Sequence, residues 1–257
     1  YEQGVTKAHS EDITSTANNL LKFKDRTPTN GMGYVILRSN KSFAEQLTQE
    51  DTIYEIRYDF DLDGESVSIP TNSILQFNGG SLSNGTLSGS FYMYGNTKNN
   101  TCSISGSILN KYYMYDTGSA AINASIIQSC RNGVELMEDI ETQSCTLHSS
   151  INGNNHVVEF ANTDGIDAFV LNSTDNITIE DIRFKKDSTI ADVYKTHIVK
   201  IADCNDIVIR NCYSEGGVNI RTTTAYWNAN GETCRNFVID NCQFNIDWTP
   251  INHINPD

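Results

Sequence analysis

Beyond residue 52, apolar residues come in short clusters that alternate with polar residues and end at Gly, Asn, Asp or Ser. Residues 52–60 have two contrasting faces, made of Tyr54, Ile56, Tyr58 and Phe60 on one side and Glu55, Arg57 and Asp59 on the other. Alternation with a period of two is typical of a strand with one buried face. We predict a half-buried strand here, and short strands rather than helices from this point on.

A nine-residue pattern recurs three times near the C-terminus, at residues 176–184, 206–214 and 236–244. Each copy starts 30 residues after the one before it and aligns without gaps. A fixed period indicates units that stack on one another, because one such unit is too short to bury a core alone.

The copies carry matching side chains, which are Ile177/Ile207/Phe237 and Ile179/Ile209/Ile239 facing inward, Glu180/Arg210/Asp240 facing outward, Asp181/Asn211/Asn241 at a corner, and Ile182/Cys212/Cys242 facing inward after it. Asn and Asp tolerate the left-handed backbone of a corner, and alternating charge suits a stacked outward column. We predict a parallel β-solenoid with strands about 4.8 Å apart. Three unrelated strands of a sandwich are the alternative.

The first 51 residues have a mixed pattern instead. They predict a short helix at 15–23, a turn at 27–31, a strand at 33–38 and a second short helix at 42–49. We therefore divide the chain into a small mixed region, residues 1–51, and a β-helical region, residues 52–257.

Charge narrows the range of partners. The sequence has 18 basic and 32 acidic residues, a net charge of −14, and its Lys and Arg are mostly scattered singly. Such a surface repels phosphate groups, and no apolar stretch is long enough to span a bilayer. We expect neither nucleic acid nor a membrane among its partners.

Motifs for cofactors and metals are missing from the sequence. The seven cysteines include no CxxC pair, and the five histidines show no short metal-ligand spacing. The glycine-rich run at 78–90 precedes no helical pattern, so its glycines mark turns. We expect no cofactor, no metal and reduced cysteines. Cys212 and Cys242, in one inward column, would be close enough to bridge under oxidation.

Three segments resemble a module of tail-fibre and tailspike-like proteins from crAss-like and related gut-bacterial phages. They are GYVILR at 33–38, DTIYEIRYDFDLDG at 51–64 and ILQFNGGSLSNGTL at 74–87. The later repeats are similar to the pectate-lyase-like β-helix, with Asp181, Asn211 and Asn241 matching its asparagine-ladder corner. The resemblance implies an all-β fold, a right-handed parallel β-helix preceded by a small mixed N-terminal region.

The resemblance also implies a homotrimeric virion protein. Residues 1–51 would dock on other tail proteins, and the β-helix would meet polysaccharide on the host cell surface. Some similar proteins look like enzymes that cleave such glycans, and others only bind them. The alternative is a polysaccharide-degrading enzyme, either a tailspike depolymerase or a lyase secreted to the bacterial surface. We expect the chain to continue past residue 257, because residues 247–250 form no polar cap.

An enzyme would need two carboxyl groups about 5–9.5 Å apart. Glu180, Asp240 and Asp247 are the candidates, but Arg210 stands between the first two in the predicted column, which favours a charge ladder. A calcium-dependent lyase would instead use Asp203 and Asp206 with Arg210 as the base. The catalytic residues stay unassigned.

An inserted segment at residues 222–231 contains two adjacent aromatic residues, Tyr226 and Trp227. Insertions in stacked repeats form loops on one face, often the binding face. We predict that Tyr226 and Trp227 bind glycan by stacking on sugar rings. The alternative is that both rings cover the groove of a neighbouring subunit.

Overall fold

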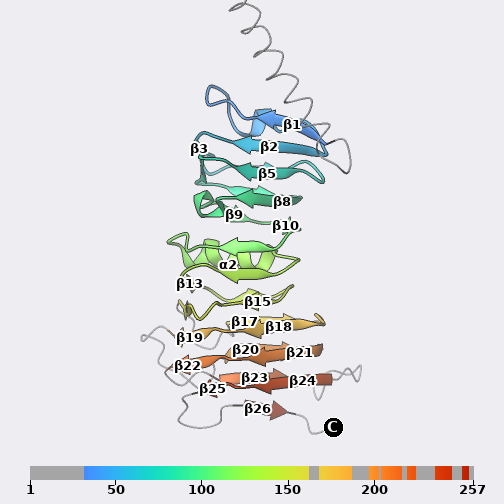
Figure 1. The fold of residues 1–257 in the computed structure, drawn as a ribbon, viewed down its shortest axis with the longest axis vertical. Coiled ribbons are helices and arrows are strands. Elements are labelled where there is room, and N and C mark those ends of the chain that lie inside the picture. Colours follow the sequence, from blue (N-terminus) through green and yellow to red (C-terminus); the bar gives the residue numbers. More distant parts are fainter. Residues whose placement is uncertain are drawn as a thin grey trace, which may run out of the picture.

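The computed structural model describes residues 32–161, 168–186, 197–202, 204–215, 219–223, 235–244 and 251–254. Throughout these residues, every pairing between named strands is parallel. The strands lie one above another along the long axis of the molecule (Figure 1). The predicted all-β class is confirmed, and the parallel sheets are compatible with a β-helix.

Three sheets form the N-terminal part of the stack. The first contains β1 (Gly33–Ile36), β2 (Thr52–Ile56), β5 (Ile74–Phe77), β8 (Ser90–Gly95) and β10 (Ser107–Ile108); the second contains β3 (Phe60–Asp61) and β6 (Leu82–Ser83); the third contains β4 (Ser66–Ser68), β7 (Thr86–Ser88) and β9 (Ser103–Ile104). Two single-turn 3-10 helices, η1 (Ala44–Gln46) and η2 (Thr97–Asn99), lie in the connections.

Three further sheets form the C-terminal part. The six-stranded sheet contains β11 (Tyr112–Met114), β12 (Val134–Leu136), β15 (Ile151–Asn152), β18 (Ile177–Glu180), β21 (Asn205–Arg210) and β24 (Arg235–Asp240); the β13 sheet contains β13 (Ile140–Thr142), β16 (Val157–Phe160), β19 (Arg183–Lys186), β22 (Tyr213–Glu215) and β25 (Gln243–Phe244); the β14 sheet contains β14 (Cys145–Thr146), β17 (Phe169–Asn172), β20 (His197–Ala202), β23 (Asn219–Thr223) and β26 (Ile251–Ile254). From β12 onward the chain visits these three sheets in a constant order.

Strand register confirms the repeat read from the sequence. Ile177 lies opposite Ile207, and Ile207 lies opposite Phe237, on three adjacent parallel strands. Ile177 and Ile207 are buried in one apolar core that continues along the stack. Each inward column is therefore a continuous line of apolar side chains, which is what a short repeated strand needs in order to bury a core.

Two glycines in the segment 74–87 are required by close stacking. A Cβ on Gly80 would lie 2.2 Å from the carbonyl oxygen of Tyr58, and one on Gly85 would lie 2.5 Å from Cβ of Leu62. Both distances are far inside van der Waals contact. The glycines of this segment thus allow one level of the stack to lie on the next.

The predicted alternation over residues 52–60 is wrong. Strand β2 ends at Ile56, and all five of its residues are buried, including Glu55. Tyr58, predicted to face inward, is 47% exposed. The period of two ends with the strand, because the chain bends before β3.

Glu55 is buried because four side-chain hydrogen bonds satisfy its carboxylate. Arg57 donates through Nε at 2.8 Å and Nη2 at 2.9 Å, and Tyr34 and Asn78 each donate one further bond. Burial by itself would raise the pKa of Glu55, but these hydrogen bonds outweigh it and lower the pKa below its ordinary value of 4.5. Burial and the bond to Glu55 raise the pKa of Tyr34 to about 12. The carboxylate therefore ties β1 and β5 to β2.

Because the pKa of Glu55 is lower in the folded chain than in the unfolded chain, its ionised form stabilises the fold above the unfolded pKa, and this contribution is lost as pH falls through the folded pKa. We predict that Glu55→Gln lowers the free energy of unfolding at pH 7 by about 1–3 kcal/mol. The loss should shrink as pH falls from 7 through the lowered folded-state pKa of Glu55, where wild type itself becomes protonated. Urea unfolding across this range measures it. Glu65→Gln at an exposed position is the control, and equal losses in both variants would contradict the prediction.

The N-terminal region is described only from residue 32, so the helix predicted at 15–23 lies outside the described residues. The helix predicted at 42–49 is limited to the single turn η1. The strand predicted at 33–38 is β1, and it pairs in register with β2. Phe43 packs on Phe60 with ring centroids 5.6 Å apart and is buried. The region boundary at residue 51 stays a prediction.

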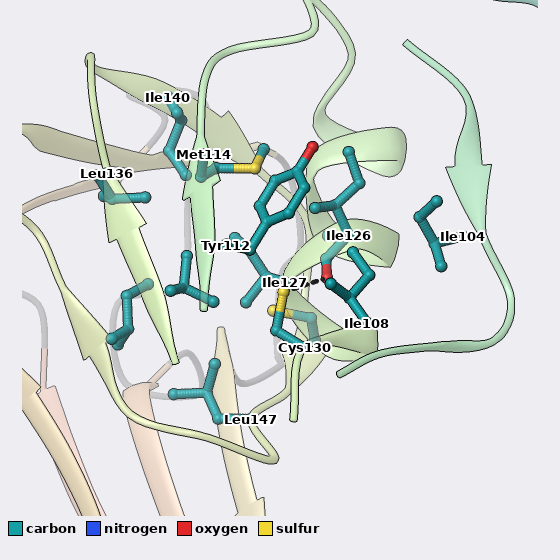
Figure 2. Packing of buried hydrophobic residues seen from close by; sticks show 14 of the residues in the cluster. Ile104, Ile108, Tyr112, Met114, Ile126, Ile127, Cys130, Leu136, Ile140 and Leu147 are labelled. Carbon is teal, nitrogen blue, oxygen red and sulfur yellow. Dashed lines mark hydrogen bonds between the residues drawn. The ribbon is translucent and has the colours of Figure 1, made fainter. Parts of the chain in front are cut away.

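A helix interrupts the strands where the sequence predicted none. Helix α2 (Ala120–Ser129) contacts β9 on one side and β13 and β14 on the other, and so joins the two parts of the stack. Figure 2 shows Ile126 and Ile127 of this helix packed among Tyr112, Ile108 and neighbouring core residues. Ser119 caps its N-terminus by accepting from the backbone N–H of Ile122. Within the described residues, no helix has the length and apolar character needed to cross a membrane.

The polar side chain of Asn123 explains why helix α2 was not predicted from the sequence. A polar residue there breaks the apolar pattern, yet its side chain is fully buried. Its Nδ2 donates to Asp116 Oδ1 at 2.6 Å and to the carbonyl oxygen of Glu141 at 2.7 Å. Its Oδ1 accepts from both the backbone N–H and the hydroxyl of Thr117, at 3.1 and 2.7 Å. The amide thus uses all of its hydrogen-bonding capacity inside the protein.

We predict that Asn123→Ala destabilises the protein by about 2–4 kcal/mol, although Ala is the better helix former, because buried partners lose their hydrogen bonds. Gln128→Ala, at an exposed position of α2, should change stability by less than about 0.5 kcal/mol. Chemical unfolding of the two variants and wild type tests this. A neutral Asn123→Ala would show that the network contributes nothing.

Candidate functional site

The outward side of the six-stranded sheet carries a continuous line of polar and charged side chains. Strand register aligns each with the next, and the line consists of Tyr113, Glu135, Asn152, Glu180, Arg210 and Asp240. We call this set the outward column. All six side chains are half-buried or exposed, whereas Ile179 and Ile209 beside them are buried. The column therefore presents one polar stripe to solvent.

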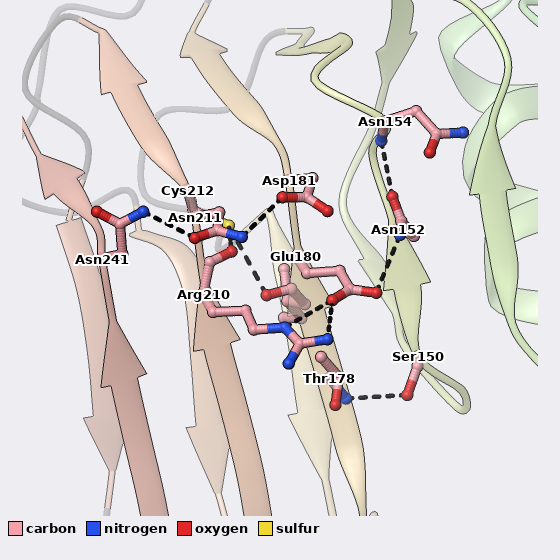
Figure 3. A network of polar contacts seen from close by, with 11 residues as sticks. Ser150, Asn152, Asn154, Thr178, Glu180, Asp181, Arg210, Asn211, Cys212 and Asn241 are labelled. Carbon is pink, nitrogen blue, oxygen red and sulfur yellow. Dashed lines mark hydrogen bonds and ion pairs between the residues drawn. The ribbon is translucent and has the colours of Figure 1, made fainter.

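Neighbouring members of the outward column bind one another (Figure 3). Glu180 accepts from Asn152 Nδ2 at 2.9 Å and from Arg210 Nε at 2.7 Å, and Arg210 Nη2 completes the ion pair. Glu135 accepts from Asn154 Nδ2 at 3.1 Å and pairs with Lys111. Two of the column's carboxylates thus have polar partners along the sheet.

The corner beside the column is the predicted ladder. Asn211 donates to Asp181 at 2.9 Å, and Asn241 donates to Asn211 at 2.8 Å. The φ angles of the three residues are 54°, 52° and 47°, in the left-handed region. Asn and Asp adopt this conformation more readily than other residues with a side chain. The hydrogen bond between Asn211 and Asp181 confirms the corner ladder. The ion pair between Arg210 and Glu180 confirms this part of the outward charge ladder.

A shallow depression of about 520 Å³ lies where the chain leaves β12, and it is lined by Lys98, Asp116, Glu138, Asp139 and His156. Glu138 accepts from Lys98 Nζ at 3.0 Å and from the backbone N–H of Asp116 at 2.8 Å. Asp139 accepts from the backbone N–H of Val157 at 2.8 Å and lies 3.2 Å from His156 Nδ1. This volume is within the range of about 300–1,000 Å³ typical of small-molecule sites.

Three carboxyl groups of this surface have lowered pKa values, which favours their ionised form. The hydrogen bond from Lys111 lowers the pKa of Glu135, and that from Lys98 lowers the pKa of Glu138. The backbone N–H of Val157 lowers the pKa of Asp139. A general acid for glycoside hydrolysis needs a raised pKa instead. These carboxylates are therefore suited to accept hydrogen bonds from hydroxyl groups and not to donate a proton.

The structure brings together some of the site residues predicted from the sequence. Arg210 lies in register between Glu180 and Asp240, as predicted. Asp206, a candidate calcium ligand, accepts a hydrogen bond from Asn236 at 2.8 Å in a second corner ladder. Asp203, Asp247, Tyr226 and Trp227 all lie outside the described residues. Among the residues that are described, no group of three or more His, Cys, Asp or Glu is placed to hold a metal ion.

The depression was not predicted from the sequence. Its five residues come from four separate parts of the chain, and the number of residues between successive strands varies there: Val134 pairs with Ile151, but Ile151 pairs with Ile179. Without a fixed period, the level at which each side chain lies cannot be counted from the sequence. No motif in the sequence links His156 to Asp139.

Comparisons with known proteins leave the family open. No family model matches the chain, and no curated protein matches its sequence. Among solved structures, it is similar to the crystal structure of a candidate glycosyl hydrolase from Parabacteroides merdae, with 11% identity and a TM-score of 0.25 over 90% of this chain and 88% of that one. A TM-score this low carries no argument about fold or function.

We predict that Arg210→Glu lowers the free energy of unfolding at low salt, because three acidic side chains would then lie on adjacent strands. Arg210→Gln should lower it less, since the ion pair that it removes is exposed. Lys41→Glu changes net charge equally away from the column and is the control. Urea unfolding at about 0.05 and 1 M NaCl measures the effect, which high salt should largely remove. An equal loss of unfolding free energy in Lys41→Glu would show that the change in net charge, and not the position in the column, causes the effect.

Proposed function

We propose that this protein is a structural component of a phage tail that presents a right-handed parallel β-helix to the host surface and binds surface glycan without cleaving it. The proposed binding surface is the outward column together with the adjoining depression. The observation that carries the proposal is that charged acceptors line one exposed surface, where Glu180 binds Asn152 and Arg210 and where the pKa values of Glu135, Glu138 and Asp139 are shifted downward.

The chemistry of the surface suits a polyhydroxylated ligand. Glu138 and Asp139 keep part of their side chains exposed, and their oxygens accept hydrogen bonds. Tyr113, at the end of the outward column, is 46% exposed, and Lys111 Nζ lies 5.6 Å from its ring centroid. We propose that a sugar stacks on this exposed ring. Lys98 lies 5.4 Å from the ring centroid of Tyr115 beside the depression. Charged acceptors next to an exposed ring resemble the mixed lining of ligand sites in general.

Attachment to a tail rests on the resemblance of residues 33–38, 51–64 and 74–87 to tail-fibre and tailspike-like proteins. These segments include β1, β2 and β5, so the resembling residues belong to the stack itself. We propose that residues 1–51 dock on other tail proteins, that the assembly is a homotrimer, and that its location is the virion. Detection of the protein in purified virions, and the mass of the native assembly, test these proposals.

A polysaccharide-degrading enzyme is the second candidate, favoured by one observation. Asp116, Glu138 and Asp139 line a single depression beside His156, so several carboxyl groups face one small volume. Hydrolysis requires a protonated acid among them. Against this, the pKa values of Glu138 and Asp139 are both lowered. The enzyme would be a tailspike depolymerase or a secreted bacterial lyase.

We predict that the protein retains host capsular polysaccharide on a surface without shortening it. Glu138→Gln combined with Asp139→Asn should weaken binding about tenfold or more, because two charged acceptors are lost. Glu159→Gln is the matched control, since Glu159 is likewise paired with a lysine, Lys185 at 2.8 Å, but lies on the β13 sheet.

Biosensor binding and size-exclusion analysis of the glycan read out the two functions separately. Shortened glycan with wild type, abolished in the double variant, would replace the binding proposal with the enzyme. Equal affinity of all three proteins would place the binding surface elsewhere.

A further inference from the structure

Two cysteines occupy equivalent places on neighbouring levels of the stack. Cys212 lies between β21 and β22, and Cys242 lies between β24 and β25. The residues on both sides are in register, because Arg210 lies opposite Asp240 and Tyr213 opposite Gln243. Adjacent strands are about 4.8 Å apart. This separation is within the range of about 4.4–6.8 Å between the Cα atoms of a disulfide.

The two thiols also point the same way. The Cys212 Sγ lies 3.2 Å from the carbonyl oxygen of Arg210 and 3.7 Å from that of Ile179. The Cys242 thiol makes the same two contacts one level on, with Asp240 at 3.2 Å and Ile209 at 3.6 Å. Equal contacts mean equal side-chain orientation, so one sulfur lies above the other. Figure 3 shows Cys212 next to the corner residue Asn211.

Their surroundings make one thiol the nucleophile and the other its partner. Cys212 is buried, whereas Cys242 is half-buried and accessible to small reagents. A hydrogen bond between the two thiols lowers the pKa of Cys242 and raises the pKa of Cys212. By contrast, burial raises the pKa values of Cys130 and Cys145 to about 12. Thiolate is the reactive form of cysteine, so reactivity is concentrated at Cys242.

We propose that Cys212 and Cys242 are an oxidisable pair, which a hydroperoxide converts into a disulfide between neighbouring levels of the stack. The Cys242 thiolate attacks one peroxide oxygen and becomes a sulfenic acid, while the other oxygen leaves as hydroxide. The Cys212 sulfur then attacks the Cys242 sulfur, and its proton leaves with the sulfenic oxygen as water. Two thiols are oxidised and one peroxide is reduced.

Trypsin makes the pair directly observable, because cleavage after Arg210, Arg221 and Arg235 places Cys212, Cys234 and Cys242 in three different peptides. The native protein is treated with hydrogen peroxide, its remaining thiols are blocked, and the digest is analysed by mass spectrometry without reduction. We expect one crosslinked species joining peptide 211–221 to the peptide that begins at Asn236 and contains Cys242, and dithiothreitol should remove it. A Cys242 peptide that is only sulfinic, or one joined to Cys234, would overturn the proposal.

A pair of variants separates the proposed hydrogen bond from simple exposure. Cys212→Ser keeps a donor beside Cys242, and Cys212→Ala removes it. At pH 7, loss of the donor should slow alkylation of Cys242 by iodoacetamide about threefold, since the smaller thiolate fraction is partly offset by higher nucleophilicity. Cys212→Ser should keep the wild-type rate, and Cys145→Ala is the control for loss of a buried cysteine. Equal rates in the Ser and Ala variants of Cys212 would contradict the assigned roles.

Discussion

Parallel hydrogen bonding between strands in register is the interaction on which this structure depends. It places each side chain directly against the equivalent side chain one level away, as Ile177, Ile207 and Phe237 are placed. Every position therefore becomes a column, and a column is stable only if its members are compatible with one another. Apolar residues fill the inward columns, and Asp181, Asn211 and Asn241 form the corner, where positive φ favours Asn and Asp.

The same constraint explains the charges of the outward surface. In a chain of net charge −14, carboxylates stacked at the strand spacing would repel one another. Arg210, Lys111 and Lys98 are placed beside Glu180, Glu135 and Glu138 respectively, and each pair is an ion pair. The partners lower the pKa values of Glu135 and Glu138. Stacking thus favours ionised acceptors over the protonated acid of a hydrolase, and this supports the glycan-binding proposal.

Departures from regular stacking mark the places where the molecule has other properties. Helix α2 joins the two parts of the stack, and buried Asn123 holds it by hydrogen bonds to Asp116, which precedes the helix, and to Glu141 in β13. The depression with Asp139 and His156 lies just beyond this junction, where the levels differ in length. Cys212 and Cys242 lie instead where the stacking is regular, and the strict register of the flanking strands aligns their two sulfur atoms.

The sequence by itself determined the class of fold, the register of the last three levels, the corner ladder and the position of Arg210 between Glu180 and Asp240, because a fixed 30-residue period lets position in the chain stand for position in space. Only the tertiary structure decided the burial of Glu55, the helix around Asn123 and the depression at Asp139. In each of these, a polar group is stabilised by partners distant in sequence, such as Asn78 for Glu55 and Glu141 for Asn123. Alternation and propensity describe only neighbours along the chain, so they cannot show such partners.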